Sequence, residues 1–114
     1  IPGIRTRPVY FRPSFSKWTG DICQGVQIHI FEPRDINPVE LGVRLLFAVR
    51  DLYPDDFRII PPGPSGKHFL DLLCGGTQLA EALENHDSPD GLLNSWREEA
   101  EHFSAKRRDF LIYT

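Results

Sequence analysis

The sequence predicts an α+β fold in which a small mixed sheet is covered by about three to four helices. Strand-like runs rich in β-branched and aromatic residues lie near both ends of the chain. Between them, apolar residues recur at helical spacing, and prolines and glycines mark where helices begin and end. A chain of 114 residues is long enough to bury one core. We therefore expect residues 1–114 to form a single domain.

The first predicted strand covers residues 7–13, which are apolar and aromatic but include Pro8 and Pro13. Proline has no amide N–H to donate to a neighbouring strand, so we expect a short strand or one at the edge of a sheet. Residues 14–24 read as a loop closed by Gly20 and Gly25.

The second predicted strand covers residues 25–31, in which side chains alternate between two faces. One face is apolar and suits the core: Val26, Ile28 and Ile30. The other face carries Gln27, His29 and Phe31.

A helix over residues 38–53 has the clearest boundaries in the chain. Asn37 can cap it, Pro38 is tolerated at its first position, and Glu40 completes a capping box. Pro54 ends it. A glycine at position 42 lowers the stability of the helix by up to about 1 kcal/mol relative to alanine. We therefore expect another element to pack closely against Gly42. The apolar residues that recur at helical spacing are Leu41, Leu45, Leu46, Val49, Leu52 and Tyr53.

The rest of the chain predicts a short strand at 57–60, a helical turn at 67–74 and a helix at 77–85. Ser88-Pro89-Asp90 begins a further helix, and residues 110–113 read as a terminal strand. On the last helix the apolar face is formed by Leu92, Leu93, Trp96, Ala100 and Phe103.

Composition excludes several classes of function. The net charge is −3, with 13 basic residues scattered among 16 acidic ones, which does not favour nucleic acid as a partner. No apolar stretch approaches the roughly 18–20 residues of a membrane span, and no signal peptide is recognisable. The chain begins with Ile1 and contains no methionine, so we expect either a processed product or, in preference, a domain of a longer protein. Cys23 and Cys74 lack metal-ligand spacing; two buried free thiols or a disulfide both remain open.

No catalytic motif is present in the sequence: there is no phosphate-binding glycine loop, no His-Glu-x-x-His and no nucleophile elbow. The four histidines show no ligand spacing, so we expect no metal site and no cofactor. The sequence alone therefore identifies no catalytic residue.

Gln27 and His29 form the strongest candidate for binding. Two residues apart on a strand, they share one face at about 6.5–7 Å. An amide and an imidazole together offer donors and acceptors that suit an amino sugar. The alternative is that a helix or loop covers this face and satisfies both groups internally.

Tyr10, Arg12 and Lys17 are further candidates on or beside the first strand. Tyr10 can equally be half-buried packing with an exposed hydroxyl, and Lys17 can be an ordinary solvated lysine. Arg12 can bind a carboxylate with two parallel hydrogen bonds or can simply aid solubility. Trp18 is free either to stack on a sugar or to pack beneath its loop.

The segment from Arg7 to Lys17, followed by Gly20, Cys23 and residues 25–30, resembles a family. It is similar to the C-terminal part of bacterial exo-acting β-N-acetylmuramidases, formerly a family of unknown function. The resemblance covers essentially the whole chain. Departures from the family pattern are Ser14 in place of threonine, Trp18 in place of tyrosine or histidine, and Phe31-Glu32 in place of Thr-Asp. Later positions that fit are Pro38-Val39, Gly42, Leu52-Tyr53-Pro54, Phe57, Phe69, Asp71-Leu72-Leu73, Gly75, Trp96, Phe103, Arg108 and Leu111-Ile112-Tyr113.

The resemblance implies the smaller domain of a two-domain glycoside hydrolase. Such enzymes remove N-acetylmuramic acid from the non-reducing ends of peptidoglycan fragments during cell-wall recycling. Their larger N-terminal Rossmann-like domain is absent here and supplies the catalytic acid, so the chain alone is expected to be inactive. Its partners are then that domain and a muropeptide or N-acetylmuramic acid, and a periplasmic or secreted location is favoured over the cytoplasm. The residues expected to line the substrate cleft are Tyr10, Arg12, Lys17, Gln27 and His29.

Two other readings remain open. The chain can be an independent carbohydrate- or peptide-binding module, or a structural interaction domain whose polar strand face is buried against a neighbour. The first predicts that the isolated chain binds muropeptides, and the second predicts that it does not.

Overall fold

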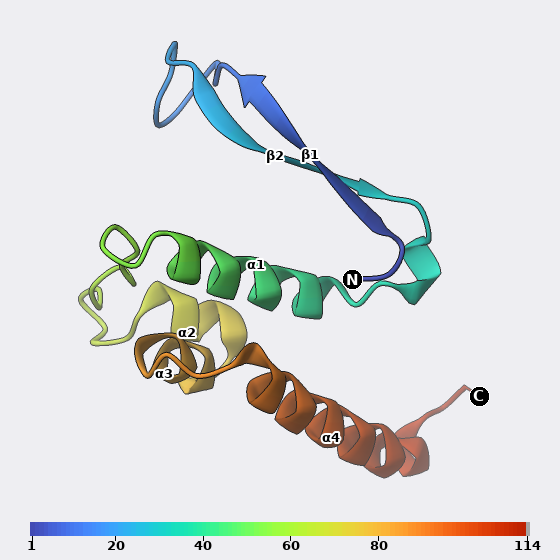
Figure 1. Ribbon diagram of the computed structural model, residues 1–114. Coiled ribbons are helices and arrows are strands. Elements are labelled where there is room, and N and C mark those ends of the chain that lie inside the picture. Colours follow the sequence, from blue (N-terminus) through green and yellow to red (C-terminus); the bar gives the residue numbers. More distant parts are fainter. Residues whose placement is uncertain (114) are drawn as a thin grey trace. The chain divides into compact units, whose positions relative to one another are not determined.

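The computed structural model describes residues 1–113 and contains a two-stranded antiparallel sheet and four α-helices (Figure 1). This confirms the predicted α+β class. The chain divides into two compact units, Ile1–Leu41 and the residues from Gly42 onward.

The first unit is a β-hairpin. β1 (Ile4–Phe11) pairs with β2 (Cys23–Ile30) in a register that runs from Ile4 opposite Ile30 to Phe11 opposite Cys23. In a two-stranded sheet both strands are edges, as the prolines of the first strand predicted. A 3-10 helix, η1 (Pro33–Asp35), follows the hairpin.

Gly25 leaves room for an aromatic side chain of the neighbouring strand. It lies opposite Val9 in the register, and the ring of Phe11 covers it. A Cβ atom added to Gly25 would sit 2.9 Å from Cε1 of Phe11, which is closer than carbon atoms approach without something moving.

The prediction that Val26, Ile28 and Ile30 face the core is wrong. Val26 is 61% exposed and Ile30 is 51% exposed, and the buried core lies in the second unit. Two strands bury too little surface between themselves to form a core. Alternation identifies the apolar face of a strand but not what covers it.

Helix α1 (Pro38–Leu52) begins as the sequence predicted. The side-chain Oδ1 of Asn37 accepts hydrogen bonds from the backbone amides of Val39 at 3.0 Å and Glu40 at 3.1 Å. These bonds satisfy two of the amides that the first turn of a helix leaves without partners.

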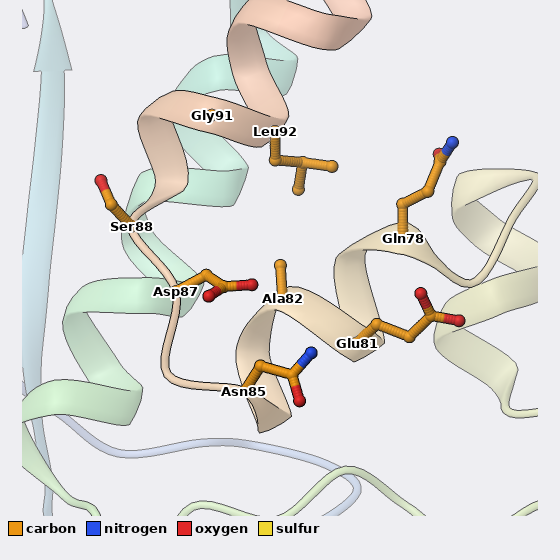
Figure 2. A pocket seen from close by; sticks show the side chains of 8 residues that line it. All are labelled: Gln78, Glu81, Ala82, Asn85, Asp87, Ser88, Gly91 and Leu92. Atoms are coloured by element: carbon orange, nitrogen blue, oxygen red, sulfur yellow. The ribbon is translucent and has the colours of Figure 1, made fainter.

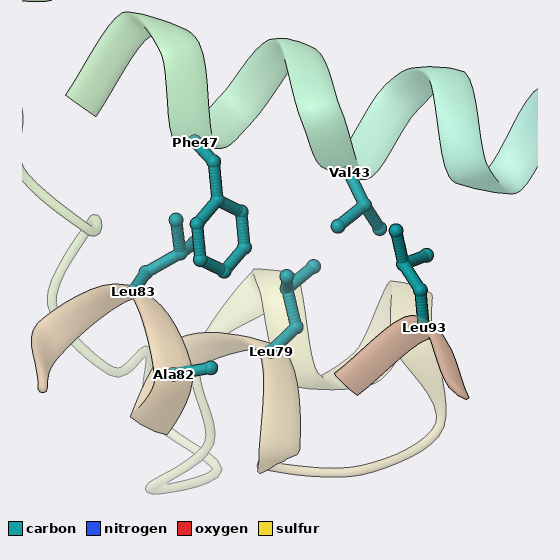
Figure 3. Close-up of a cluster of buried hydrophobic side chains, with 6 residues drawn as sticks. All are labelled: Val43, Phe47, Leu79, Ala82, Leu83 and Leu93. Carbon is teal, nitrogen blue, oxygen red and sulfur yellow. The ribbon is translucent and has the colours of Figure 1, made fainter. Parts of the chain in front are cut away.

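The core lies between α1, α3 (Gln78–Glu84) and the start of α4 (Pro89–Arg107) (Figure 3). Phe57 and Ile59 pack against its edge. Phe47 and Leu83 are the largest of its fully buried side chains. The buried cluster consists of Val43, Phe47, Leu79, Ala82, Leu83 and Leu93.

The buried face of α1 differs from the stripe that its spacing suggested. Val43 and Phe47 face the core, whereas Val49 is 46% exposed. Nothing lies within 4 Å of a Cβ built on Gly42, so the close packing expected there is absent from the described structure. Because α1 carries apolar residues on more than one side, spacing alone could not identify the buried one. The exposed stripe consists of Leu45, Val49, Leu52 and Tyr53.

Arg50 on α1 is the buried charged residue of this core, with an exposure of 6%. Its guanidinium donates hydrogen bonds to the backbone carbonyls of Ala82 and Leu83 at 3.4 Å, and to that of Asp87 at 3.2 and 3.3 Å. It also bonds Asp51 through Nε at 2.7 Å. Arg50 therefore caps the C-terminal end of α3 from a neighbouring helix.

The remaining helices follow the predicted boundaries. The helix α2 (Phe69–Cys74) ends at Gly75, whose φ of 77° is in the left-handed region that glycine adopts freely. The side chain of Ser88 caps α4 by accepting from the amide of Asp90 at 3.3 Å. The second half of α4 passes beyond the core, so Phe103 is exposed rather than buried.

Two predicted strands are wrong. Residues 57–60 have no regular structure, because within the described chain no strand lies beside them to supply hydrogen bonds. Residues 108–110 form a 3-10 helix (η2, Arg108–Phe110), and 111–113 are irregular and exposed. β-branched and aromatic composition predicts strand propensity, but a strand also needs a partner.

Candidate functional site

The hairpin gathers five polar and aromatic residues on one face. In the antiparallel register Arg5 lies opposite His29 and Arg7 lies opposite Gln27, so their side chains share a face. Phe31, directly after β2, continues this face: the Arg5 guanidinium carbon lies 5.5 Å from the centre of its ring. We call Arg5, Arg7, Gln27, His29 and Phe31 the polar patch.

The amide of Gln27 is held in place across the strands. Arg7 donates from Nε to Oε1 of Gln27 at 2.7 Å. This bond occupies the amide oxygen and leaves the amide NH2 of Gln27 and the terminal nitrogens of Arg7 as donors. The pair therefore offers donors to a carboxylate, an amide carbonyl or a hydroxyl oxygen.

His29 stacks beside Phe31, with ring centres 6.5 Å apart and planes inclined at 29°. Its Nε2 is shielded from solvent and has no hydrogen-bond partner among the described residues. A buried nitrogen without a partner costs free energy. His29 is thus the member of the patch that most needs a further polar group.

Tyr10 lies on the opposite face of the hairpin from Gln27 and His29. It pairs with Gln24 in the register and is 70% exposed. Strand alternation therefore separates Tyr10 from the polar patch, although all three residues are on the same hairpin.

Arg12 and Lys17 lie in the loop after β1, and both are exposed. The backbone of this loop is fixed by hydrogen bonds from the Gly20 amide to the Pro13 carbonyl at 3.1 Å and from the Asp21 amide to the Trp18 carbonyl at 3.0 Å. No hydrogen bond or ion pair ties either side chain to another part of residues 1–113. Trp18 is exposed in the same loop, not packed beneath it.

The structure thus brings Gln27 and His29 together, as their spacing predicted, and adds Arg5, Arg7 and Phe31 to them. For Arg5 and Arg7 the sequence left two roles open, binding a carboxylate or, as the preferred reading, keeping the surface soluble. Their alternation with apolar neighbours was visible in the sequence, but placing them beside Gln27 required the register of the hairpin.

The helical unit carries a separate shallow pocket of about 450 Å³ between α3 and the start of α4 (Figure 2). In Figure 2 carboxylates and amides surround a floor that includes Ala82 and Leu92. None of the predicted site residues lines it. The polar residues around it are Gln78, Glu81, Asn85, Asp87 and Ser88.

Other site types find no support in the part of the chain that is described. No group of three or more His, Cys, Asp or Glu residues there is arranged to hold a metal ion. Cys23 and Cys74 are free thiols, and Cys74 is exposed, so the expected burial of both is wrong. No helix within residues 1–113 is both long and apolar enough to cross a membrane.

Comparison with known proteins relates the chain to cell-wall hydrolases. The sequence model of the family described as "Exo-beta-N-acetylmuramidase NamZ, C-terminal" matches residues 1–113. The chain is 32% identical over 113 residues to the peptidoglycan beta-N-acetylmuramidase NamZ of Bacillus subtilis, which covers 99% of this chain and 26% of that protein. A crystal structure of a DUF1343 family protein from Bacteroides fragilis shares the fold, with a TM-score of 0.82 and 23% identity over 100% of this chain and 30% of the other.

Proposed function

Because this chain belongs to the family of exo-beta-N-acetylmuramidase NamZ C-terminal domains, we propose that it is the substrate-binding domain of an exo-acting β-N-acetylmuramidase. The chain spans about a quarter of the length of its B. subtilis relative. The catalytic acid belongs, in this proposal, to the part of the enzyme outside the chain. The substrate is N-acetylmuramic acid at the non-reducing end of a peptidoglycan fragment.

The polar patch carries this proposal. N-acetylmuramic acid presents a lactyl carboxylate, an acetamido group and hydroxyls. Arg5 and Arg7 suit the carboxylate, since a guanidinium binds carboxylates with two parallel hydrogen bonds. Gln27 presents amide donors held by Arg7, and His29 has a ring nitrogen that lacks a partner. Phe31 offers an aromatic surface beside them.

The hairpin then forms one wall of the substrate cleft. Arg12 and Lys17, in the loop after β1, are further charge partners for the carboxylate. Tyr10, on the other face, contacts a different part of the glycan or the neighbouring domain. Because peptidoglycan lies outside the cytoplasmic membrane, a periplasmic or secreted protein fits this role.

The test uses the full-length enzyme and a chromogenic N-acetylmuramic acid glycoside. We expect Gln27→Ala and His29→Ala each to lower kcat/KM at least about tenfold, about 1.4 kcal/mol of transition-state stabilisation. Gln24→Ala is the matched control, because Gln24 is the same residue type on the same strand but belongs to the opposite face. Wild-type kcat/KM in folded Gln27→Ala and His29→Ala enzymes would refute the cleft assignment.

A docking role is the competing function, and the exposed apolar face of the hairpin favours it. The two roles separate in a titration of the 114-residue chain with N-acetylmuramic acid. Amide shifts at Gln27 and His29 support substrate binding. Unchanged spectra at millimolar sugar support docking alone.

A further inference from the structure

A second pocket, of about 270 Å³, lies at the C-terminal end of α2. Its walls combine a lysine, a carboxylate, a hydroxyl and two glycines, and it is separate from the polar patch. We call it the Lys67 pocket, lined by Lys67, Asp71, Leu72, Gly75, Gly76 and Thr77.

Asp71 is the anchored member of this pocket. Its backbone carbonyl accepts hydrogen bonds from the amides of Gly75 at 2.9 Å and Gly76 at 3.2 Å, which fixes the turn after α2. Its side-chain Oδ1, by contrast, is shielded from solvent and has no hydrogen-bond partner. Burial of an unpaired carboxylate oxygen is costly. Because Oδ1 is shielded, Oδ2 is the oxygen of Asp71 that a ligand can reach, and it too has no partner among the described residues.

The other polar groups of the pocket are also uncommitted. No ion pair joins Lys67 to Asp71, and the ammonium of Lys67 has no other partner within residues 1–113. The hydroxyl of Thr77 does not cap α3, although Thr77 occupies the capping position. Lys67, Asp71 and Thr77 therefore line one cavity, and no hydrogen bond or ion pair joins their side chains to one another.

The negative charge of Asp71 also affects the neighbouring thiol of Cys74. Partial burial of the Cys74 thiol and, next in size, the charge of Asp71 raise the pKa of Cys74. An anionic Asp71 carboxylate is the form that accepts hydrogen bonds from a bound ligand.

A ligand that matches this pocket needs an anionic group that accepts hydrogen bonds from Lys67 and an N–H or O–H group that donates to Asp71. Its volume accommodates one sugar ring but not an oligosaccharide. We propose that the Lys67 pocket is a second binding site, specific for a carboxylate-bearing amino sugar. Its ligand class rests on the proposed function, since N-acetylmuramic acid carries a carboxylate together with hydroxyl and amide donors.

The experiment is an NMR titration of the 114-residue chain with two sugars that differ only in the lactyl group. N-acetylmuramic acid is expected to shift the amides of Gly75, Gly76 and Thr77. N-acetylglucosamine, which lacks the carboxylate, is expected to bind there about tenfold more weakly or not at all. Equal shifts with both sugars, or none with either, would overturn the proposal.

Variants assign the response to side chains. Lys67→Met and Asp71→Asn are each expected to abolish the shifts at Gly75 and Gly76, whereas Lys106→Met, at an exposed lysine on α4 that does not line the pocket, leaves them intact. Thr77→Val keeps the shape of the side chain and is expected to reduce the amide shifts at Gly75 and Gly76. It replaces Asp71→Asn as the test if the Asp71→Asn protein does not fold. Unchanged shifts in folded Lys67→Met protein would remove the lysine from the site and with it the proposal.

The two proposals fail separately. If Gln27→Ala and His29→Ala impair the full-length enzyme but the Lys67 pocket gives no shifts, the proposed function stands and the second site falls. If the pocket responds to N-acetylmuramic acid while both hairpin variants keep wild-type kcat/KM, the cleft assignment falls instead.

Discussion

Arg7 and Gln27 face each other across the hairpin and are joined by a hydrogen bond of 2.7 Å from Nε to Oε1. The bond fixes which end of the amide remains available, because only the oxygen of Gln27 can accept from Arg7. Arg7 thereby acts as a positioning residue for Gln27, even where it does not itself contact a substrate.

The role of Arg7 predicts a change in KM. In the full-length enzyme, Arg7→Met removes one hydrogen bond worth about 0.5–1.5 kcal/mol and is expected to raise KM roughly twofold to tenfold. The effect on kcat is expected to be smaller, since the reacting groups belong to the other domain in our proposal. Steady-state kinetics measures the split, and an unchanged KM would contradict the positioning role.

The two sides of α1 predict opposite sensitivities to truncation. Phe47 is fully buried in the core, so Phe47→Ala is expected to destabilise the chain by about 3–5 kcal/mol. Val49 on the exposed stripe is expected to cost less than about 1 kcal/mol when changed to alanine. Urea unfolding followed by circular dichroism compares them, and similar losses would place Val49 in a core as well.

Replacing Arg50 is expected to cost more than replacing another arginine of the same helix. Arg50→Met removes the guanidinium that donates to the carbonyls of Ala82, Leu83 and Asp87, of which the Ala82 carbonyl also accepts from the Asp87 amide, and a loss of about 2–4 kcal/mol follows. Arg44 forms a partly exposed ion pair with Asp90 at 2.9 Å, so Arg44→Met is expected to cost at most about 1 kcal/mol. Denaturant midpoints measure the difference, and equal losses would contradict the capping role.

The Asn37 cap predicts a difference between two small substitutions. Asn37→Ala removes the acceptor for two amides and is expected to destabilise α1 by about 1 kcal/mol. Asn37→Asp keeps an oxygen that can accept from the same amides. Its free energy of unfolding is expected to stay within a few tenths of a kcal/mol of the wild-type value. Thermal unfolding distinguishes them, and a silent Asn37→Ala would mean that water replaces the cap.

The environment of Cys74 predicts slow alkylation. Burial and the charge of Asp71 raise the pKa of Cys74, so a smaller fraction is thiolate at pH 8 than for an unperturbed thiol. Asp71→Asn removes one of these causes, lowers the pKa and is expected to speed reaction with iodoacetamide. Mass spectrometry after timed quenching gives the rate, and an unchanged rate in Asp71→Asn would rule out the charge effect.

Much of the fold could be predicted from the sequence, because local chemistry determines it. The cap at Asn37, the stop at Gly75 and the start of α4 at Ser88 follow from residues within a few positions of each boundary. The two wrongly predicted strands are segments whose structure depends on a partner strand far away in the sequence. Residues 57–60 and 110–113 have the composition of strands, but the described chain supplies no neighbouring strand for them.

The candidate site shows the same division. The shared face of Gln27 and His29 follows from strand alternation, which is local. The presence of Arg7 beside Gln27, and the separation of Tyr10 from both, depend on the register of β1 against β2. The unpaired Oδ1 of Asp71 depends on how α2 and the following turn enclose it, and no pattern of residue types reveals that.

The contacts of Arg50 also govern the order in which the chain can fold during synthesis. Its acceptors at Ala82, Leu83 and Asp87 lie 32 to 37 residues further along the chain. A nascent chain that has completed α1 therefore holds an Arg50 that lacks these carbonyl acceptors and can bond only its neighbour Asp51, and an uncovered Phe47, until α3 and the segment after it have emerged. A shortened form of the protein that stops before Asp87 lacks one of these carbonyl acceptors and the Leu93 side chain of the core, so we expect the shortest stable C-terminal truncation to retain at least the loop that leads into α4.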